Sequence, residues 1–247
     1  MGLEQKIDPA LAASMLDWWR LAGVDTLVDE GPRNWLEAPA APVRTPAARV
    51  QTTPAAPAAL PEMLPDTLDA FIAWRLGDAA PEAGWPGARV APLGMAGAAL
   101  MVVIDCPERD DAEQLLGGAA GQLFDRMMAA IGRTRADLYL ASMAAVAPAS
   151  GRMPASADPR FATLLRHHVA LVAPRRLLVM GNAASRALLG MDALQARGTL
   201  RAINHIGGEM TVAPQAVVTF SPRFLLERPA AKAEAWKDLQ LLNGGWA

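Results

Sequence analysis

The sequence predicts an α/β fold, with three layers (α/β/α) around a mostly parallel, four-stranded sheet. Three observations lead to this prediction. Short apolar runs alternate with segments of helical periodicity, which is typical of parallel strands joined by helices. The apolar runs are continuous rather than alternating, as expected for strands that are covered on both faces. Hydrophobic residues make up 52% of the 247 residues, which is enough to fill a core between the layers.

The N-terminal part of the chain has a different organisation. Asp8-Pro9 is a typical helix start, and the apolar stripe that follows ends at Gly23, so we expect a helical arm over residues 1–37. Residues 38–61 contain nine Ala and six Pro, which predicts a flexible linker without a core of its own. Trp18-Trp19 in the arm is a candidate contact for a partner protein. Packing of the same pair onto the main domain is an equally good interpretation.

The main domain is expected over residues 62–247, and it contains the alternation of strands and helices. Asp158-Pro159 marks a helix start, while Pro148 and Gly181-Asn182 follow two of the apolar runs. We expect strands over residues 99–105, 137–146, 176–180 and 216–220. We expect helices over residues 64–76, 119–131, 158–172, 183–189 and 230–242.

Composition excludes several kinds of site. Cys106 is the single cysteine of the sequence, so a disulfide within the chain and a metal site built from several cysteines are both excluded. The N-terminus has no apolar signal region, and no run of 18 apolar residues follows. We therefore expect a cytoplasmic protein without a membrane segment.

The net charge of −2 is unevenly distributed. Residues 1–98 carry 7 Lys and Arg against 12 Asp and Glu, whereas residues 99–247 carry 16 against 13. Of those 16 cations, 14 are Arg, a residue suited to bidentate phosphate contacts. Ordinary surface arginines explain the same count, so charge alone does not decide whether the protein binds nucleic acid.

Polar residues follow the predicted strands at the edge of the sheet where ligands bind in open α/β folds. Asp105 ends the first strand and Ser142 lies in the second. Gly181-Asn182 and Ser221-Pro222 follow the third and fourth. Helix caps and turns explain each of these residues singly, but their expected convergence at one edge favours a binding site.

Several longer motifs occur in order along the main domain. They include Gly121–Gly132, Pro148–Pro154, Val179–Ala184, Arg197-Gly198, Thr219–Leu226 and the pattern from Lys232 to Leu239. Together they make residues 99–242 resemble the family 4 uracil-DNA glycosylases, a bacterial and archaeal branch that usually carries an iron–sulfur cluster. The resemblance implies a uracil-DNA glycosylase-like fold and a role in DNA repair by base excision.

The resemblance also implies roles for residues that differ from the family pattern. Asp105 falls at the Glu of the first motif and Ser221 at the His expected to stabilise charge on uracil. In the base pocket, Leu116 falls at the Phe that stacks on the flipped uracil and Ser142 at the Asn that reads its edge. We therefore take Asp105 and Ser221 as candidate catalytic residues, although Asp105 is also explained as a cap of the following turn.

The cluster ligands of the family are absent from the corresponding positions. Two of them fall at Val146 and Phe161, and Cys106 stands alone, so we expect neither an iron–sulfur cluster nor another metal or cofactor.

The DNA-facing positions are better retained. Arg152, Asn182, Ser185 and Arg223 are suited to phosphate contacts, and Leu225 is a candidate wedge for the gap left by a flipped base. The leucines after Arg223 are equally explained as core contacts at a helix start.

Three functional hypotheses follow. The first is a glycosylase-fold protein of DNA metabolism with reduced or lost catalysis, which acts by binding DNA, single-stranded or duplex, or a protein partner. The second is an active glycosylase that uses Asp105 as base on uracil or another damaged base. The third is a protein-interaction module that acts through Trp18-Trp19.

Overall fold

A computed structural model describes residues 63–153, 159–203 and 213–244. The predicted arm (residues 1–37), with Trp18-Trp19, and the predicted linker (residues 38–61) lie outside the described residues. No helix within the described part of the chain is long and apolar enough to span a bilayer.

The sheet has five strands in the order β2-β1-β3-β5-β4. Their bounds are β1 Leu100–Ile104, β2 Leu138–Ser142, β3 Arg176–Met180, β4 Arg201–Ala202 and β5 Gln215–Thr219. β1, β2, β3 and β5 are parallel, which confirms the predicted α/β class and the parallel core of the sheet. The predicted number of four strands was wrong, because β4 adds a short antiparallel edge strand next to β5.

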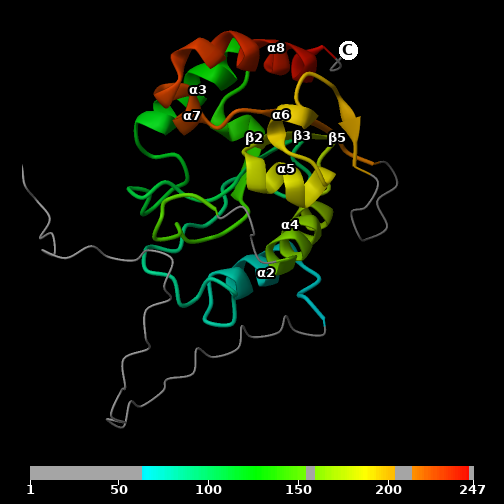
Figure 1. Cartoon of the computed structure of the whole chain (residues 1–247). Helices are drawn as coiled ribbons and strands as arrows, with labels where there is room; N and C mark the ends of the chain where they lie inside the picture. Colours follow the sequence, from blue (N-terminus) through cyan, green and yellow to red (C-terminus); the bar gives the residue numbers. More distant parts are fainter. Residues whose placement is uncertain (1–62, 154–158, 204–212, 245–247) are drawn as a thin grey trace, which may run out of the picture. The chain divides into compact units, whose positions relative to one another are not determined.

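Helices cover both faces of the sheet (Figure 1). Their bounds are α2 Leu68–Arg75, α3 Ala119–Ala130, α4 Pro159–Val172, α5 Asn182–Leu189, α6 Ala193–Ala196, α7 Pro222–Glu227 and α8 Lys232–Asn243, with 3₁₀ turns η1 Arg135–Asp137 and η2 Pro229–Ala231. Side chains of α3, α7 and α8 share one core cluster with alternate strand residues such as Val102 and Leu178. This arrangement is the three-layer fold that the sequence predicts.

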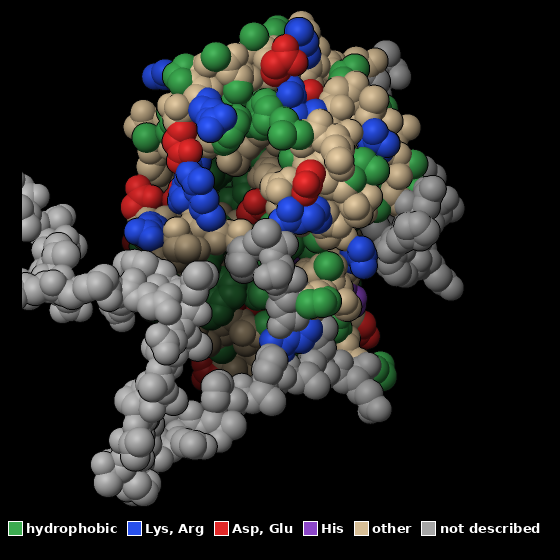
Figure 2. All heavy atoms as spheres, in the orientation of Figure 1, with side chains coloured by type: hydrophobic (Ala, Val, Ile, Leu, Met, Phe, Trp, Pro, Cys, Tyr) green, Lys and Arg blue, Asp and Glu red, His purple; other side chains and the backbone are tan. Residues whose placement is uncertain are grey.

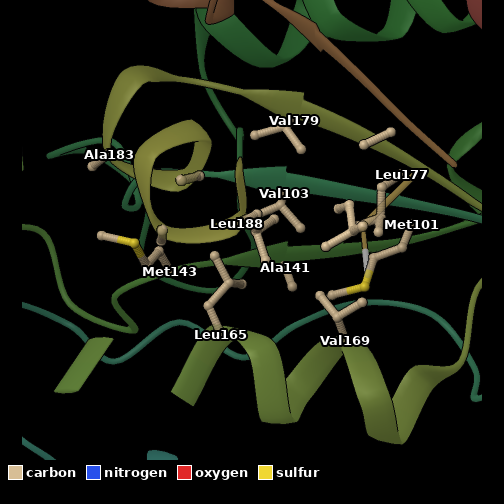
Figure 3. Close-up of a cluster of buried hydrophobic side chains, with 14 of the residues drawn as sticks. Met101, Val103, Ala141, Met143, Leu165, Val169, Leu177, Val179, Ala183 and Leu188 are labelled. Carbon is tan, nitrogen blue, oxygen red and sulfur yellow. The ribbon is translucent and has the colours of Figure 1, made fainter. Parts of the chain in front are cut away.

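The core on the opposite face is built by α4 and α5. Leu165 and Val169 of α4 point toward the strand residues Met101, Val103 and Leu177 (Figure 3). All five residues are almost fully buried, and every residue of β1 and of β3 is buried as well. Burial on both faces explains why these strands have continuous apolar sequences rather than alternating ones.

The strand order indicates where in the sheet a ligand is expected to bind. From β1 the chain goes to one neighbour, β2, and then returns to pair on the other side of β1 as β3. Connections leave in opposite directions from this point, so the loops after β1 and β3 separate and leave a crevice at the carboxyl ends of the strands. Asp105 follows β1 at this crevice, and Asn182 follows β3.

Candidate nucleobase cleft

A cleft of about 530 Å³ lies at this edge of the sheet. Its walls come from the ends of β1, β3 and β5, from the loop around Gly151 and from α7. Six of the predicted site residues line it: Asp105, Leu116, Arg152, Asn182, Ser221 and Arg223. The volume falls in the range of about 300–1,000 Å³ that is typical of small-molecule sites.

Asp105 is fixed by the start of α5. Its carboxylate accepts hydrogen bonds from the backbone N–H of Asn182 (3.1 Å) and of Ala184 (2.8 Å). Gly181 permits this contact, because a Cβ at that position would lie 2.3 Å from an Asp105 oxygen. The carboxylate therefore occupies the anion position at the helix N-terminus, where the sequence suggested a phosphate.

Burial raises the pKa of the Asp105 carboxyl above its ordinary value, and the N–H groups of α5 act in the opposite direction. A carboxyl group that is both held by fixed donors and partly desolvated at a cleft is suited to acid–base chemistry.

Ser221 and Asn182 have structural contacts within the cleft wall. Ser221 Oγ accepts from the backbone N–H of Phe224 at 3.3 Å and so caps α7. Because Oγ acts there as an acceptor, its O–H remains able to donate into the cleft. Asn182 Oδ1 accepts from the N–H of Ala193 at 2.8 Å, which leaves the amide NH₂ as the group it can offer to a ligand.

Leu116 is held in an unusual backbone conformation with φ of +56°. The carboxylate of Asp111 accepts from the N–H groups of Leu116 (2.8 Å), Gly117 (2.7 Å) and Glu108 (2.9 Å), and so shapes the loop that carries Leu116. Sequence reasoning missed this role of Asp111, since nothing distinguishes it from the neighbouring acidic residues.

The cleft also has aromatic side chains. Phe220 and Phe224 stack with ring centroids 4.7 Å apart, and both line the cleft. The Arg197 guanidinium lies 4.1 Å from the Phe220 ring centre. These two rings line the same cleft as Leu116, the residue that falls at the Phe of the family pattern.

Two of the three arginines that line the cleft, Arg152 and Arg223, are paired with carboxylates, and the third, Arg228, lies over the Phe224 ring. Arg223 forms an ion pair with Glu108, with Nε 2.6 Å from Oε2, and it also donates to the carbonyl of Gly151 at 2.6 Å. Arg152 makes a two-pronged contact with Glu227 at 2.6 and 2.8 Å. Basic and acidic side chains are intermingled on this view of the surface (Figure 2). The rim is therefore mixed in charge rather than basic.

Three predicted site residues lie elsewhere. Ser142 ends β2 and is not among the residues that line the cleft. Ser185 is fully buried and donates to the carbonyl of Met191 at 2.9 Å. Leu225 is 1% exposed within the core cluster of α3, α7 and α8. Phosphate contact by Ser185 and a wedge role for Leu225 were therefore wrong, because both side chains pack inward; Leu226 is the exposed leucine at 42%.

The residues at the predicted cluster positions do not suit an iron–sulfur cluster. Val146 and Phe161 are buried apolar side chains and offer no ligand. Cys106, the single thiol of the sequence, lines the cleft instead, and burial raises its pKa to about 12, which disfavours the thiolate that binds metal. Within the described residues, no group of three or more His, Cys, Asp or Glu is arranged to hold a metal ion.

Polar and aromatic groups fill the region around Val146 and Phe161. Arg75 and Glu82 form a buried ion pair at 2.7 Å. Arg75 also donates to the carbonyl of Met143 (2.7 Å), and Glu82 accepts from the N–H of Ala145 (2.8 Å). We name these four residues the buried clamp. The Phe161 ring packs beside it, 5.9 Å from the Arg75 guanidinium and 5.5 Å from the Trp85 ring.

Comparison with known proteins agrees with this architecture. The sequence model of the Uracil DNA glycosylase superfamily matches residues 93–240. A type-4 uracil-DNA glycosylase of Pyrobaculum aerophilum is 26% identical over 151 residues, which cover 59% of this chain and 77% of that protein. Both matches confirm the predicted resemblance to family 4, and the matched region contains the cleft.

Proposed function

Because the chain belongs to the uracil DNA glycosylase superfamily, we propose that it binds DNA and receives a flipped base in its cleft, with base excision reduced or lost. One observation carries the proposal. The cleft lies at the crossover point of the sheet and combines Asp105, Asn182 and Ser221 with the ring surfaces of Phe220 and Phe224. Such a combination suits a planar, partly apolar heterocycle.

Reduced catalysis follows from the side chains that differ from the family pattern. An aromatic face is worth about 1–3 kcal/mol per stacked base, and Leu116 does not provide one. A donor aimed at developing negative charge is worth about 2.7–4 kcal/mol, and Ser221 offers only a neutral hydroxyl there. Ser142, away from the cleft lining, does not replace the edge-reading amide, a pairing worth about 1–3 kcal/mol. Residues that act as a unit are not additive, but even one such loss slows a reaction by tenfold or more.

A binding experiment tests the first part of the proposal. We expect single-stranded and duplex oligonucleotides to bind, with an affinity that falls as salt rises. Arg152→Ala should weaken binding for all sequences and lower the salt slope by less than about one contact, because Glu227 competes with phosphate for this guanidinium. Lys237→Ala is the matched control, since Lys237 does not line the cleft. Fluorescence anisotropy over a salt series measures these effects, and an affinity that is independent of salt contradicts the proposal.

Active excision with Asp105 as base is the second candidate. The raised pKa of this carboxyl and its place at the cleft favour it. A panel of oligonucleotides with damaged bases tests it: product that forms with one base and disappears in Asp105→Ala supports an active enzyme.

We also propose a protein partner and a cytoplasmic location. A protein partner that contacts Trp18-Trp19 is tested by pull-down with and without residues 1–37. A cytoplasmic location fits a protein that handles DNA, and fractionation of cells that express the chain tests it.

A further inference from the structure

Thr219, the last residue of β5, has a hydroxyl group that folding does not satisfy. The residue is fully buried, and its Oγ1 has no hydrogen-bond partner within the part of the chain that the structure describes. A buried hydroxyl without a partner destabilises the folded state, and valine has nearly the same shape without that cost. Ser185, which is equally buried, shows the usual outcome, since its hydroxyl bonds the Met191 carbonyl. The unsatisfied Thr219 hydroxyl therefore needs an explanation, and a bound ligand is one.

The place of Thr219 in the sheet gives the explanation. Thr219 pairs in register with Met180, and Met180 pairs with Ile104, so the three residues form one row across the ends of β5, β3 and β1. All three line the cleft. Side chains in one row of a parallel sheet share a face. The Thr219 hydroxyl is a polar group at the floor of an otherwise apolar part of the cleft, where all three side chains are at most 3% exposed.

We propose that the Thr219 hydroxyl is a binding and specificity group, which forms a hydrogen bond with the edge of the nucleobase held in the cleft. The inference rests on the proposed function and adds a residue to it. Ile104, Met180 and Leu116 present apolar surface to a ring, and a hydroxyl both donates and accepts, so it pairs with an edge carbonyl or an edge N–H.

The same surroundings disfavour an anionic ligand at this group. Asp105 directly follows Ile104 and lines the cleft, whereas the Glu108 carboxylate is paired with Arg223. A phosphate held against the Asp105 carboxylate would be repelled, while a neutral base would not. The ligand chemistry is thus a neutral heterocycle with a polar edge.

Two variants separate ligand binding from a structural role. Thr219→Val removes the hydroxyl and keeps the shape, and Thr219→Ser keeps the hydroxyl. The probes are single-stranded oligonucleotides with one central uracil, hypoxanthine or xanthine, and a reference with an abasic site at that position. The ratio of affinities for the best-bound base and for the abasic reference isolates the contribution of the base.

We expect Thr219→Val to lower this ratio roughly three- to tenfold, the loss of one hydrogen bond, and Thr219→Ser to retain it. Thr219→Val should unfold at the same temperature as the wild type or a higher one, because an unsatisfied hydroxyl is lost. An unchanged ratio in Thr219→Val, or a marked fall in its melting temperature, overturns the inference. If the wild type binds none of the oligonucleotides, the proposed function fails; if it binds but the ratio does not respond to Thr219→Val, only the inference fails.

Discussion

The buried clamp and the cleft differ in how they treat buried polar groups. In the clamp, Arg75 and Glu82 pair with each other and with the backbone of Met143 and Ala145. At the floor of the cleft, the buried Thr219 Oγ1 has no partner among the described residues. The polar groups of the clamp are satisfied by one another and by the backbone. The cleft is not filled, which is what continued ligand binding requires.

The largest effect is expected in the clamp. Arg75→Met or Glu82→Gln alone should lower the free energy of unfolding by about 3–5 kcal/mol, because each leaves a buried charge or backbone group without its partner. The double variant Arg75→Met/Glu82→Leu should recover part of this loss, since no unpaired charge remains. Urea denaturation measures all three. Single variants within 0.5 kcal/mol of the wild type, on the order of experimental error, would show that the clamp does not support the fold.

The two leucines of α7 give the next effect and separate core from surface. Leu225→Ala should cost about 2–5 kcal/mol in unfolding free energy, the usual cost of emptying a core site. Leu226→Ala, its exposed neighbour, should stay within about 0.5 kcal/mol. The comparison uses thermal or denaturant unfolding. A stable Leu225→Ala protein with weakened DNA binding would reinstate Leu225 as a wedge.

Asp105 should make the stability of the cleft side depend on pH. Its pKa is raised above the ordinary 3.8, so the folded state binds the proton more tightly than the unfolded chain does. Its contribution to stability is therefore greatest below pH 3.8 and falls as the pH rises through the raised pKa. The free energy of unfolding of the wild type minus that of Asp105→Asn should therefore fall as the pH rises. A value that increases with pH contradicts the raised pKa of Asp105.

The smallest effect is expected at the rim. Glu227→Gln removes the carboxylate that pairs with Arg152, which frees that cation for a phosphate. DNA affinity at low salt should rise roughly two- to fivefold, with a salt slope steeper by up to one contact. Asp125→Asn is the charge-matched control, because it removes the carboxylate partner of Arg135 and neither residue lines the cleft. Equal affinity for Glu227→Gln and wild type would show that Arg152 does not meet DNA.

The sequence predicted the parallel strands well because their boundaries are local. β3 matches its predicted range of 176–180, where an apolar run lies between Pro174 and Gly181. The strand predicted over residues 137–146 stops at Ser142, because the chain then turns: Ala144 donates to the carbonyl of Asp105, beyond the end of β1, and Ala145 donates to the Glu82 carboxylate. β4 has two residues, too few for any periodicity to appear.

Site residues were predicted less completely, because their roles depend on contacts between distant segments. Asp105 was chosen correctly as a cleft residue, but its partners belong to α5, 77 and 79 residues away. Ser185 was expected to contact phosphate because it lies near a helix start, yet it is buried and its hydroxyl donates to the Met191 carbonyl. Arg75 and Glu82 gave no signal, since their backbone partners lie more than 60 residues further along the chain.

The central claim is that the cleft accepts a base but excises it poorly, and a single-turnover assay with excess protein tests this claim most directly. The substrate is a single-stranded oligonucleotide with one uracil, and binding is followed in the same samples. We expect the oligonucleotide to be bound while abasic product stays at the level of the protein-free control. Product formed at the rate of a working enzyme, and abolished by Asp105→Ala, would contradict the account.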